Sequence, residues 1–314
     1  MPSDAREHLC DVGACNLDMV EGTDEAMSLT HSWYKDLAVT LMVTLWAQCA
    51  WIHELDAQNV KRLFPSRAFE VRLLAAPRAA GSGAKLVFNA RGPTEFGNTG
   101  EGEVALGTTV PIYLISGSSQ EDAIVIGTEG AVFGRFTLTT ITRDLISTDW
   151  IFAIPLTWHM GSHWLRFRYH HKSSHIGDEY ISRFDPEIGD YSRDAADFTA
   201  FYEVSPSLGV YGGGNWAINV HPDGSGRFLV RAGVQTEASQ VRGAISPYAA
   251  ADVEWEQNNS WEPRLNIQVG IRLPEIAGRR SLRLAAEFLA GPSPQGQFRF
   301  ENVRHITIGF FIDP

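Results

Sequence analysis

Strict alternation between apolar and polar residues constrains the fold of this chain more than any other feature of its sequence. The clearest case lies between positions 264 and 273. Its apolar series is Leu265, Ile267, Val269, Ile271 and Leu273. The intervening residues are Arg264, Asn266, Gln268, Gly270 and Arg272. Because successive side chains of a β-strand point to opposite faces, a period of two predicts a strand with one apolar and one polar face.

About twelve segments with this tendency follow one another after Ala84. They span residues 84–91, 101–115, 122–139, 147–159, 162–174, 191–204, 207–220, 226–237, 244–256, 261–273, 279–290 and 302–313. Many reach the length of about 9–11 residues that a tilted membrane strand needs. We therefore predict an all-β fold, a closed antiparallel transmembrane β-barrel of about 12 strands. Its apolar residues would face lipid, and its Arg, Glu and Gln residues would face the interior.

Aromatic residues near many predicted strand ends agree with a barrel. They are Trp150, Trp158, Trp164, Tyr248, Trp255 and Trp261. Membrane barrels carry such residues in girdles at both interfaces. The alternative is a soluble periplasmic β-sandwich that binds a ligand, in which the apolar faces pack on each other. Segment length and the leader described next favour the barrel.

An apolar run, Leu37–Ala50, precedes the predicted strands. It is short for a membrane-spanning helix, and its small terminal residues are typical of a secretory signal peptide. We predict an upstream extension over residues 1–26, a signal peptide over 27–50 and a mature chain from Trp51. The alternative for this run is a buried N-terminal helix. All three cysteines, Cys10, Cys15 and Cys49, would be removed with the leader.

The remaining chain divides into two predicted parts. Residues 51–83 show no clear alternation and are expected to lie below the barrel in the periplasm or to plug it. Residues 84–314 would form the barrel in the bacterial outer membrane, with both of its ends on the periplasmic side because the strand number is even. The formal net charge of −11, with no basic cluster among aromatic residues, argues against a nucleic-acid partner.

Two polar residues interrupt the apolar series of segment 162–174. Leu165, Phe167 and Tyr169 set the lipid-facing series, and His171 and Ser173 continue it. Residues i and i+2 of a strand share a face and lie about 6.6 Å apart along it. A histidine there can take the proton of the serine hydroxyl, which can then attack an acyl ester arriving from the bilayer.

Several stretches resemble known bacterial families. LFPSR, LLAAPR, YHHKSSHIGDEY, DYSRD and GPSPQGQF resemble domain of unknown function 1207, from about Leu63 to the C-terminus. That resemblance implies a secreted or outer-membrane protein and no defined activity. His171-Lys172-Ser173 resembles the H-x-S motif of outer membrane phospholipase A and of lipid A 3-O-deacylase. This second resemblance implies a lipid-facing His–Ser pair, an orienting third residue, phospholipid or lipid A as substrate, and calcium as a candidate cofactor.

The third residue has two candidates. The outward parity of segment 191–204, continued backwards, passes Asp194 and Ser192 and reaches Asp190. We predict Asp190, because the orienting residue of phospholipase A also lies on the following strand. Glu179 is the alternative, because the deacylase carries its acid shortly after the motif. The predicted catalytic residues are thus His171, Ser173 and Asp190.

Other interpretations remain open. His171 is also suited to the membrane interface as an amphipathic residue, with Ser173 at headgroup level. A metal site of His170, His171 and His175 is disfavoured, because His170 and His171 point to opposite faces of a strand. For the whole protein, the alternative to a lipid esterase is a non-enzymatic barrel that acts as a narrow channel, a lipid-binding protein or a structural anchor. The sequence leaves the oligomeric state open.

Overall fold

The computed structural model describes residues 60–65, 71–116, 122–187, 189–238, 245–274 and 281–313. The predicted upstream extension, signal peptide and start of the mature chain lie outside these residues. No helix within the described ranges is long and apolar enough to cross a membrane.

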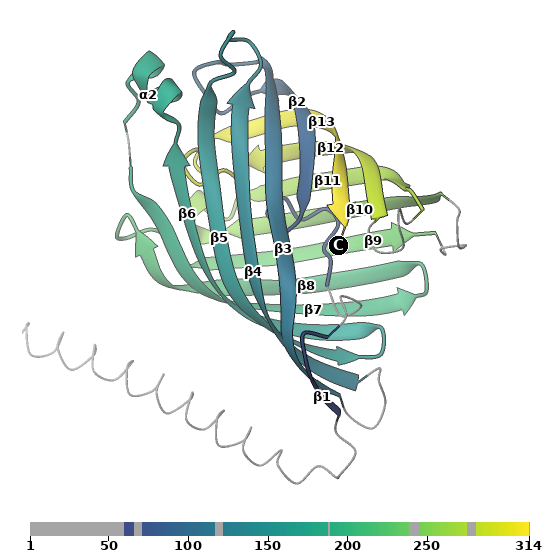
Figure 1. Cartoon of the computed structure of the whole chain (residues 1–314). Helices are drawn as coiled ribbons and strands as arrows, with labels where there is room; N and C mark the ends of the chain where they lie inside the picture. Colours follow the sequence, from purple (N-terminus) through teal and green to yellow (C-terminus); the bar gives the residue numbers. More distant parts are fainter. Residues whose placement is uncertain are drawn as a thin grey trace, which may run out of the picture. The chain divides into compact units, whose positions relative to one another are not determined.

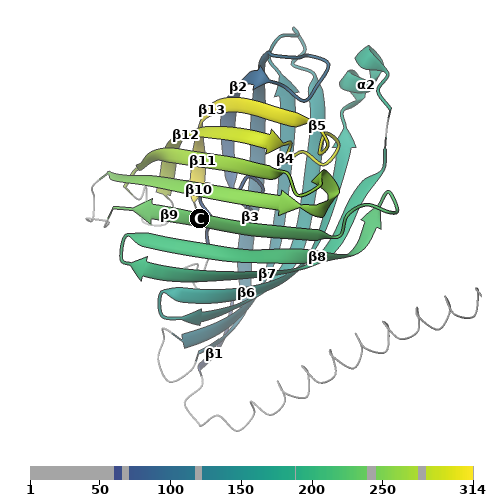
Figure 2. The ribbon, with the colours of Figure 1, turned by 180° about the vertical axis from the view of Figure 1, so that it is seen from behind.

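Within the described residues, twelve antiparallel strands form a closed barrel (Figures 1 and 2). They are β2 (Ser82–Arg91), β3 (Gly100–Ser116), β4 (Asp122–Thr137), β5 (Leu145–Met160), β6 (His163–Ile176), β7 (Tyr191–Ser205), β8 (Leu208–His221), β9 (Phe228–Glu237), β10 (Ser246–Glu256), β11 (Pro263–Arg272), β12 (Ser281–Pro292) and β13 (Asn302–Asp313). Each strand pairs with its neighbour in sequence, and β13 pairs with β2 to close the ring. The prediction of a closed barrel of about twelve strands is confirmed.

The two faces of the barrel wall differ as the alternation predicts. In β11, Ile267 and Val269 are 39% and 50% exposed, whereas Asn266 and Gln268 are 2% and 1% exposed. This is the inverse of a soluble protein, in which apolar side chains are buried. An apolar outer surface and a polar interior are the properties of a barrel that stands in lipid.

Three short elements supplement the barrel. Strand β1 (Val60–Leu63) pairs with the last residues of β3, and the 3₁₀-helix η3 (Gln257–Asn259) follows β10. Helix α2 (Asp178–Phe184) lies in the connection between β6 and β7. Because the strands alternate in direction, the connections β2–β3, β4–β5 and β12–β13 reach the same end of the barrel as α2 (Figure 1). We call this end the α2 end.

Aromatic side chains hold α2 in place. Tyr180 is 1% exposed, and its ring meets Phe96, Phe184 and Phe298 at centroid distances of 5.8, 4.9 and 5.8 Å. Its hydroxyl accepts a hydrogen bond from the backbone N–H of Glu95 at 3.0 Å. Two other connections, β2–β3 and β12–β13, therefore pack on this one helical residue at the α2 end.

Tyr180→Ala is expected to release α2 while the barrel stays closed. Truncating a buried aromatic residue costs about 3–5 kcal/mol, and here that loss falls on a seven-residue helix. Limited proteolysis in detergent should then cut the β6–β7 connection much faster than in the wild-type protein. Glu179→Ala is the matched control, because its side chain is exposed on the same helix. Equal cleavage of the two variants would contradict the packing role of Tyr180.

Residues 71–81, which we call the plug segment, lie inside the barrel. Ala75 accepts a hydrogen bond on its carbonyl oxygen from Asn266 Nδ2 at 2.7 Å. The backbone N–H of Leu74 donates to Gln235 Oε1 at 3.2 Å. On the other side of the ring, Arg78 Nε donates to Asp149 Oδ2 at 3.0 Å. Since these partners come from strands all around the wall, the segment crosses the interior.

Candidate functional site

The central contact of the candidate site joins His171 on β6 to Asp194 on β7. These residues are direct cross-strand partners in the antiparallel pairing of the two strands. Their side chains point outward, and His171 Nδ1 lies 2.7 Å from Asp194 Oδ1. Because a carboxylate can only accept, this bond places the imidazole proton on Nδ1. The other ring nitrogen, Nε2, is then free to accept a proton.

Neighbouring strands fix the Asp194 carboxylate. The Tyr169 hydroxyl donates to its Oδ1 at 3.3 Å, and Asn219 Nδ2 donates to its Oδ2 at 3.4 Å. Tyr169 lies on β6 and Asn219 is the partner of Asp194 on β8. A carboxylate that is hydrogen-bonded from both neighbouring strands can set the orientation of the imidazole.

Ser173 follows His171 by two residues on the same outward face. It lies opposite Trp150 of β5 and Ser192 of β7. Among the described residues no hydrogen bond joins Ser173 to His171, and both side chains are partly exposed. Catalytic hydrogen bonds are often long before substrate binds, so a rotation of the two side chains is all that the pair needs.

The surface around this polar pair is apolar. Phe152, the cross-strand neighbour of His171 on β5, is 52% exposed, and Trp150 beside Ser173 is 53% exposed. Phe167 and Tyr169 precede the pair on β6 and are also exposed. His171 and Ser173 lie within the last six residues of β6, close to the α2 end. The pair therefore lies on the apolar outer surface near the α2 end of the barrel.

The structure separates the predicted third residues from His171. Asp190 lies just before β7 and is exposed, and Glu179 is an exposed residue of α2. Asp194, four residues beyond Asp190 on the same parity, takes the position opposite His171. The sequence parity had reached Asp194, but only the strand register identifies it as the residue that bonds the imidazole.

The three histidines near this site do not converge. His170 is buried and faces the lumen, whereas His171 and His175 lie on the outer parity. Among the residues that the structure describes, no group of three or more His, Cys, Asp or Glu side chains is arranged to hold a metal ion.

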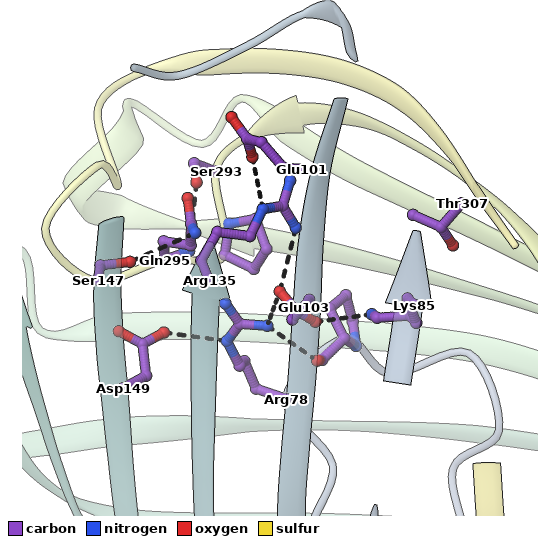
Figure 3. Close-up of polar contacts among 12 residues, drawn as sticks. Arg78, Lys85, Glu101, Glu103, Arg135, Ser147, Asp149, Ser293, Gln295 and Thr307 are labelled. Carbon is purple, nitrogen blue, oxygen red and sulfur yellow. Dashed lines mark hydrogen bonds and ion pairs between the residues drawn. The ribbon is translucent and has the colours of Figure 1, made fainter. Parts of the chain in front are cut away.

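On the inner side of the wall, ion pairs fill the lumen (Figure 3). Arg78 of the plug segment bonds Asp149 on one side and Glu103 on the other, at 3.0 and 3.4 Å. Glu103 also receives Lys85 at 2.8 Å and Arg135 at 3.2 Å. These ion pairs cross the lumen and narrow it between the strands that carry them.

A comparison with protein families assigns this chain to one of them. The family described as "Protein of unknown function (DUF1207)" matches residues 56–312. The chain belongs to this family. Among curated proteins, none matches the sequence.

Solved structures with a similar fold are outer-membrane barrels. Outer membrane phospholipase A from Escherichia coli has a TM-score of 0.50 and 11% identity, over 74% of this chain and 92% of that chain. An active-site mutant of that E. coli enzyme has a TM-score of 0.50 and 12% identity, over 79% of this chain and 95% of that chain. The outer membrane phospholipase dimer from Salmonella typhi, with bound calcium, has a TM-score of 0.49 and 14% identity, over 76% of this chain and 93% of that chain. At such low identity the E. coli structures show a shared barrel fold alone.

Proposed function

We propose that this protein is an outer-membrane barrel that hydrolyses acyl esters of membrane lipids on its lipid-facing surface. The observation that supports this most is the His171–Asp194 hydrogen bond, 2.7 Å long, on the outside of the wall with Ser173 beside it. A general base, its orienting carboxylate and a serine hydroxyl form the set that acyl transfer requires. The exposed aromatic residues around them would bring an acyl chain to the site.

The reaction would proceed through an acyl-serine. His171 Nε2 takes the proton from Ser173 Oγ, which bonds to the ester carbonyl carbon. The resulting tetrahedral oxyanion collapses, the ester C–O bond breaks, and the leaving alkoxide takes the proton from His171. Water then attacks the acyl-serine, losing its proton to His171, and Ser173 regains that proton as the fatty acid leaves. Asp194 holds the required tautomer and stabilises the imidazolium.

Calcium dependence stays a prediction that comes from the H-x-S resemblance. Among the described residues, no group of three or more His, Cys, Asp or Glu side chains gathers at the site. The test of the function is fatty-acid release by protein folded in detergent, from phospholipid and from lipid A. Each assay is run with calcium and with EDTA. The proposal would be overturned if folded protein released no fatty acid from phospholipid or from lipid A, with calcium or with EDTA.

Asp194→Ala is expected to lower fatty-acid release by about 10²–10³-fold, because the imidazole loses the carboxylate that orients it. This loss is smaller than the one expected for removal of the nucleophile. Asp190→Ala is the comparison that separates the two candidate acids. A small loss at Asp190 with a large loss at Asp194 supports the site as proposed. The reverse order would return the orienting role to Asp190 and would require a rearrangement of the β6–β7 connection.

A second candidate function is a non-enzymatic barrel. The outward position of His171 amid aromatic residues also suits an amphipathic side chain at the membrane interface. In that case the His171–Asp194 bond would only neutralise polar groups at the lipid surface. Retention of folding without any esterase activity would favour this function.

A further inference from the structure

A cavity inside the barrel lies between the plug segment and the α2 end. It encloses about 710 Å³ of space free of protein atoms, part of it open to solvent. Seven of the described residues that line it are cationic: Arg78, Arg168, Lys172, Arg193, Arg231, Arg264 and Arg299. Three are acidic: Asp197, Glu254 and Glu256. We call this cavity the basic chamber.

Two cations of the basic chamber lack full compensation by the described carboxylates. Arg299 forms no ion pair among the described residues, and its guanidinium donates to the carbonyl oxygen of Gly296 at 3.0 Å. Lys172 has Asp149 as its ion-pair partner at 3.9 Å. Asp149 already accepts from Arg78 at 3.0 Å and from the Ser174 hydroxyl at 2.5 Å. Asp149 thus lies closer to Arg78 than to Lys172, and its ion pair with Lys172 is the weaker of the two.

The same two cations meet at one aromatic ring. Lys172 Nζ lies 5.4 Å and the Arg299 guanidinium carbon 4.8 Å from the ring centroid of Tyr191. A ring face attracts each cation, but the two positive charges repel each other in a site that water reaches only in part. An anion that contacts both cations would offset this repulsion.

Two buried nitrogen atoms without hydrogen-bond partners belong to residues that line the same chamber. His170 and Arg193 are 7% and 6% exposed. Within the described part of the chain, His170 Nδ1 and Arg193 Nε have no hydrogen-bond partner. Buried polar atoms in native proteins are almost always satisfied by protein, water or a bound ligand. Both residues line the basic chamber together with Lys172 and Arg299, so a ligand bound there lies within reach of further polar groups.

The chamber is held ready for a ligand by its roof, the β12–β13 connection. Lys172 Nζ donates to the carbonyl oxygen of Pro294 at 3.2 Å. Gln297 Nε2 donates to the carbonyl oxygens of Ser174 and Gly189 at 2.6 and 2.9 Å. The connection that carries Arg299 is thereby tied to β6, so the two cations need not be ordered when an anion binds.

We propose that the basic chamber binds a small multivalent oxyanion of the size and charge of phosphate, between Lys172 and Arg299, with His170 and Arg193 as further donors. This site is separate from the proposed esterase, because its side chains face the lumen and the ester site faces lipid.

The test is isothermal titration calorimetry of the full-length protein, folded in a phosphate-free maltoside detergent. Inorganic phosphate is titrated at constant ionic strength, with chloride as the reference anion. Saturable binding of phosphate at one site per chain is expected, together with a rise in the unfolding temperature. Lys172→Gln and Arg299→Gln should each weaken binding by about tenfold or more, because each removes a charged hydrogen-bond donor.

Matched variants keep this test decisive. Arg304→Gln removes a positive charge from an exposed residue of β13 and should leave binding unchanged. Arg299→Lys keeps the positive charge and should retain most of the affinity for phosphate. Every variant is first checked for the shift in migration of unheated protein in gels that marks a folded barrel. Loss of binding in Arg304→Gln, or no saturable phosphate binding by the wild-type protein, overturns the proposal. Binding of a short-chain phosphatidic acid without binding of inorganic phosphate also overturns it, because the site would then take a lipid.

Discussion

Ser173→Ala is expected to lower fatty-acid release by about a thousandfold or more while the barrel remains folded. Removing a nucleophile from a Ser–His–acid set costs several powers of ten in rate, because no other group can form the covalent intermediate. The measurement is the initial rate of fatty-acid release from the lipid that the wild-type protein cleaves best. Migration of unheated protein in gels verifies the fold of each variant.

Ser192→Ala is the matched control for this experiment. Ser192 lies directly opposite Ser173 on β7 and shares its outward face, so its substitution changes the same surface by the same atom. Ser174 would be a poorer control, because its hydroxyl donates to Asp149 and accepts from the backbone N–H of Gln297. A thousandfold loss in Ser192→Ala with an active Ser173→Ala would assign the nucleophile to Ser192 instead.

Ile267→Arg is expected to destabilise the barrel in lipid by about 2–4 kcal/mol, the cost of a cation on the lipid face at the midplane of a bilayer. Ile267 lies in the middle of β11 and is 39% exposed. The reason is desolvation of a charge that finds no partner in hydrocarbon. Reversible unfolding by urea in phospholipid vesicles, followed by tryptophan fluorescence, measures the change in free energy.

Phe228→Arg provides the depth control. Phe228 is the first residue of β9 and is exposed on the same outer surface, where a cation near the interface costs about 0–1 kcal/mol. Gln268→Arg would be an unsuitable control. Gln268 Oε1 accepts a hydrogen bond from Arg283 Nη1 at 2.7 Å, and an arginine in its place would repel Arg283. Equal destabilisation by Ile267→Arg and Phe228→Arg would mean that the outer surface of β11 does not face hydrocarbon.

The barrel could be predicted from the sequence because lipid and a polar lumen impose opposite demands on alternate residues. In β11 this demand is visible as Leu265, Ile267 and Val269 between Asn266 and Gln268. The same demand acts on every strand of the wall, so the twelve predicted segments correspond to the twelve strands with ends that differ by a few residues. No packing detail was needed to recover them.

The partner of His171 could not be predicted in the same way. Parity gives the face of a residue but not its position along the neighbouring strand. That position depends on the pairing of β6 with β7, which sets His171 opposite Asp194. A shift of four residues along β7 would have brought Asp190 there. The register is fixed by the whole strand pair, including its tilted aromatic pair Phe167 and Phe198, and no local sequence signal records it.

The sequence left open whether residues 51–83 lie below the barrel or plug it, and it did not predict α2, for a related reason. The plug segment has neither strand nor helix periodicity, and its contacts reach as far as Asn266, 191 residues away. In α2 a single residue, Tyr180, is buried, and its partners come from two other connections. Segments whose structure depends on distant partners leave little pattern in their own residues.

The wall of this barrel is a single layer of strands, so each strand has one face toward the outside and one toward the lumen. In β6 this arrangement constrains how the sequence can change in evolution. His171 and Ser173 face the bilayer, whereas His170 and Lys172 face the interior along the same few peptide units. A backbone shift that improves one surface necessarily displaces the other, because no second layer lies between them to absorb it. Residues on the two sides of β6 are therefore expected to vary together rather than independently. A lineage that altered the lumen at Lys172 would have to tolerate, or repair, the geometry on the lipid side.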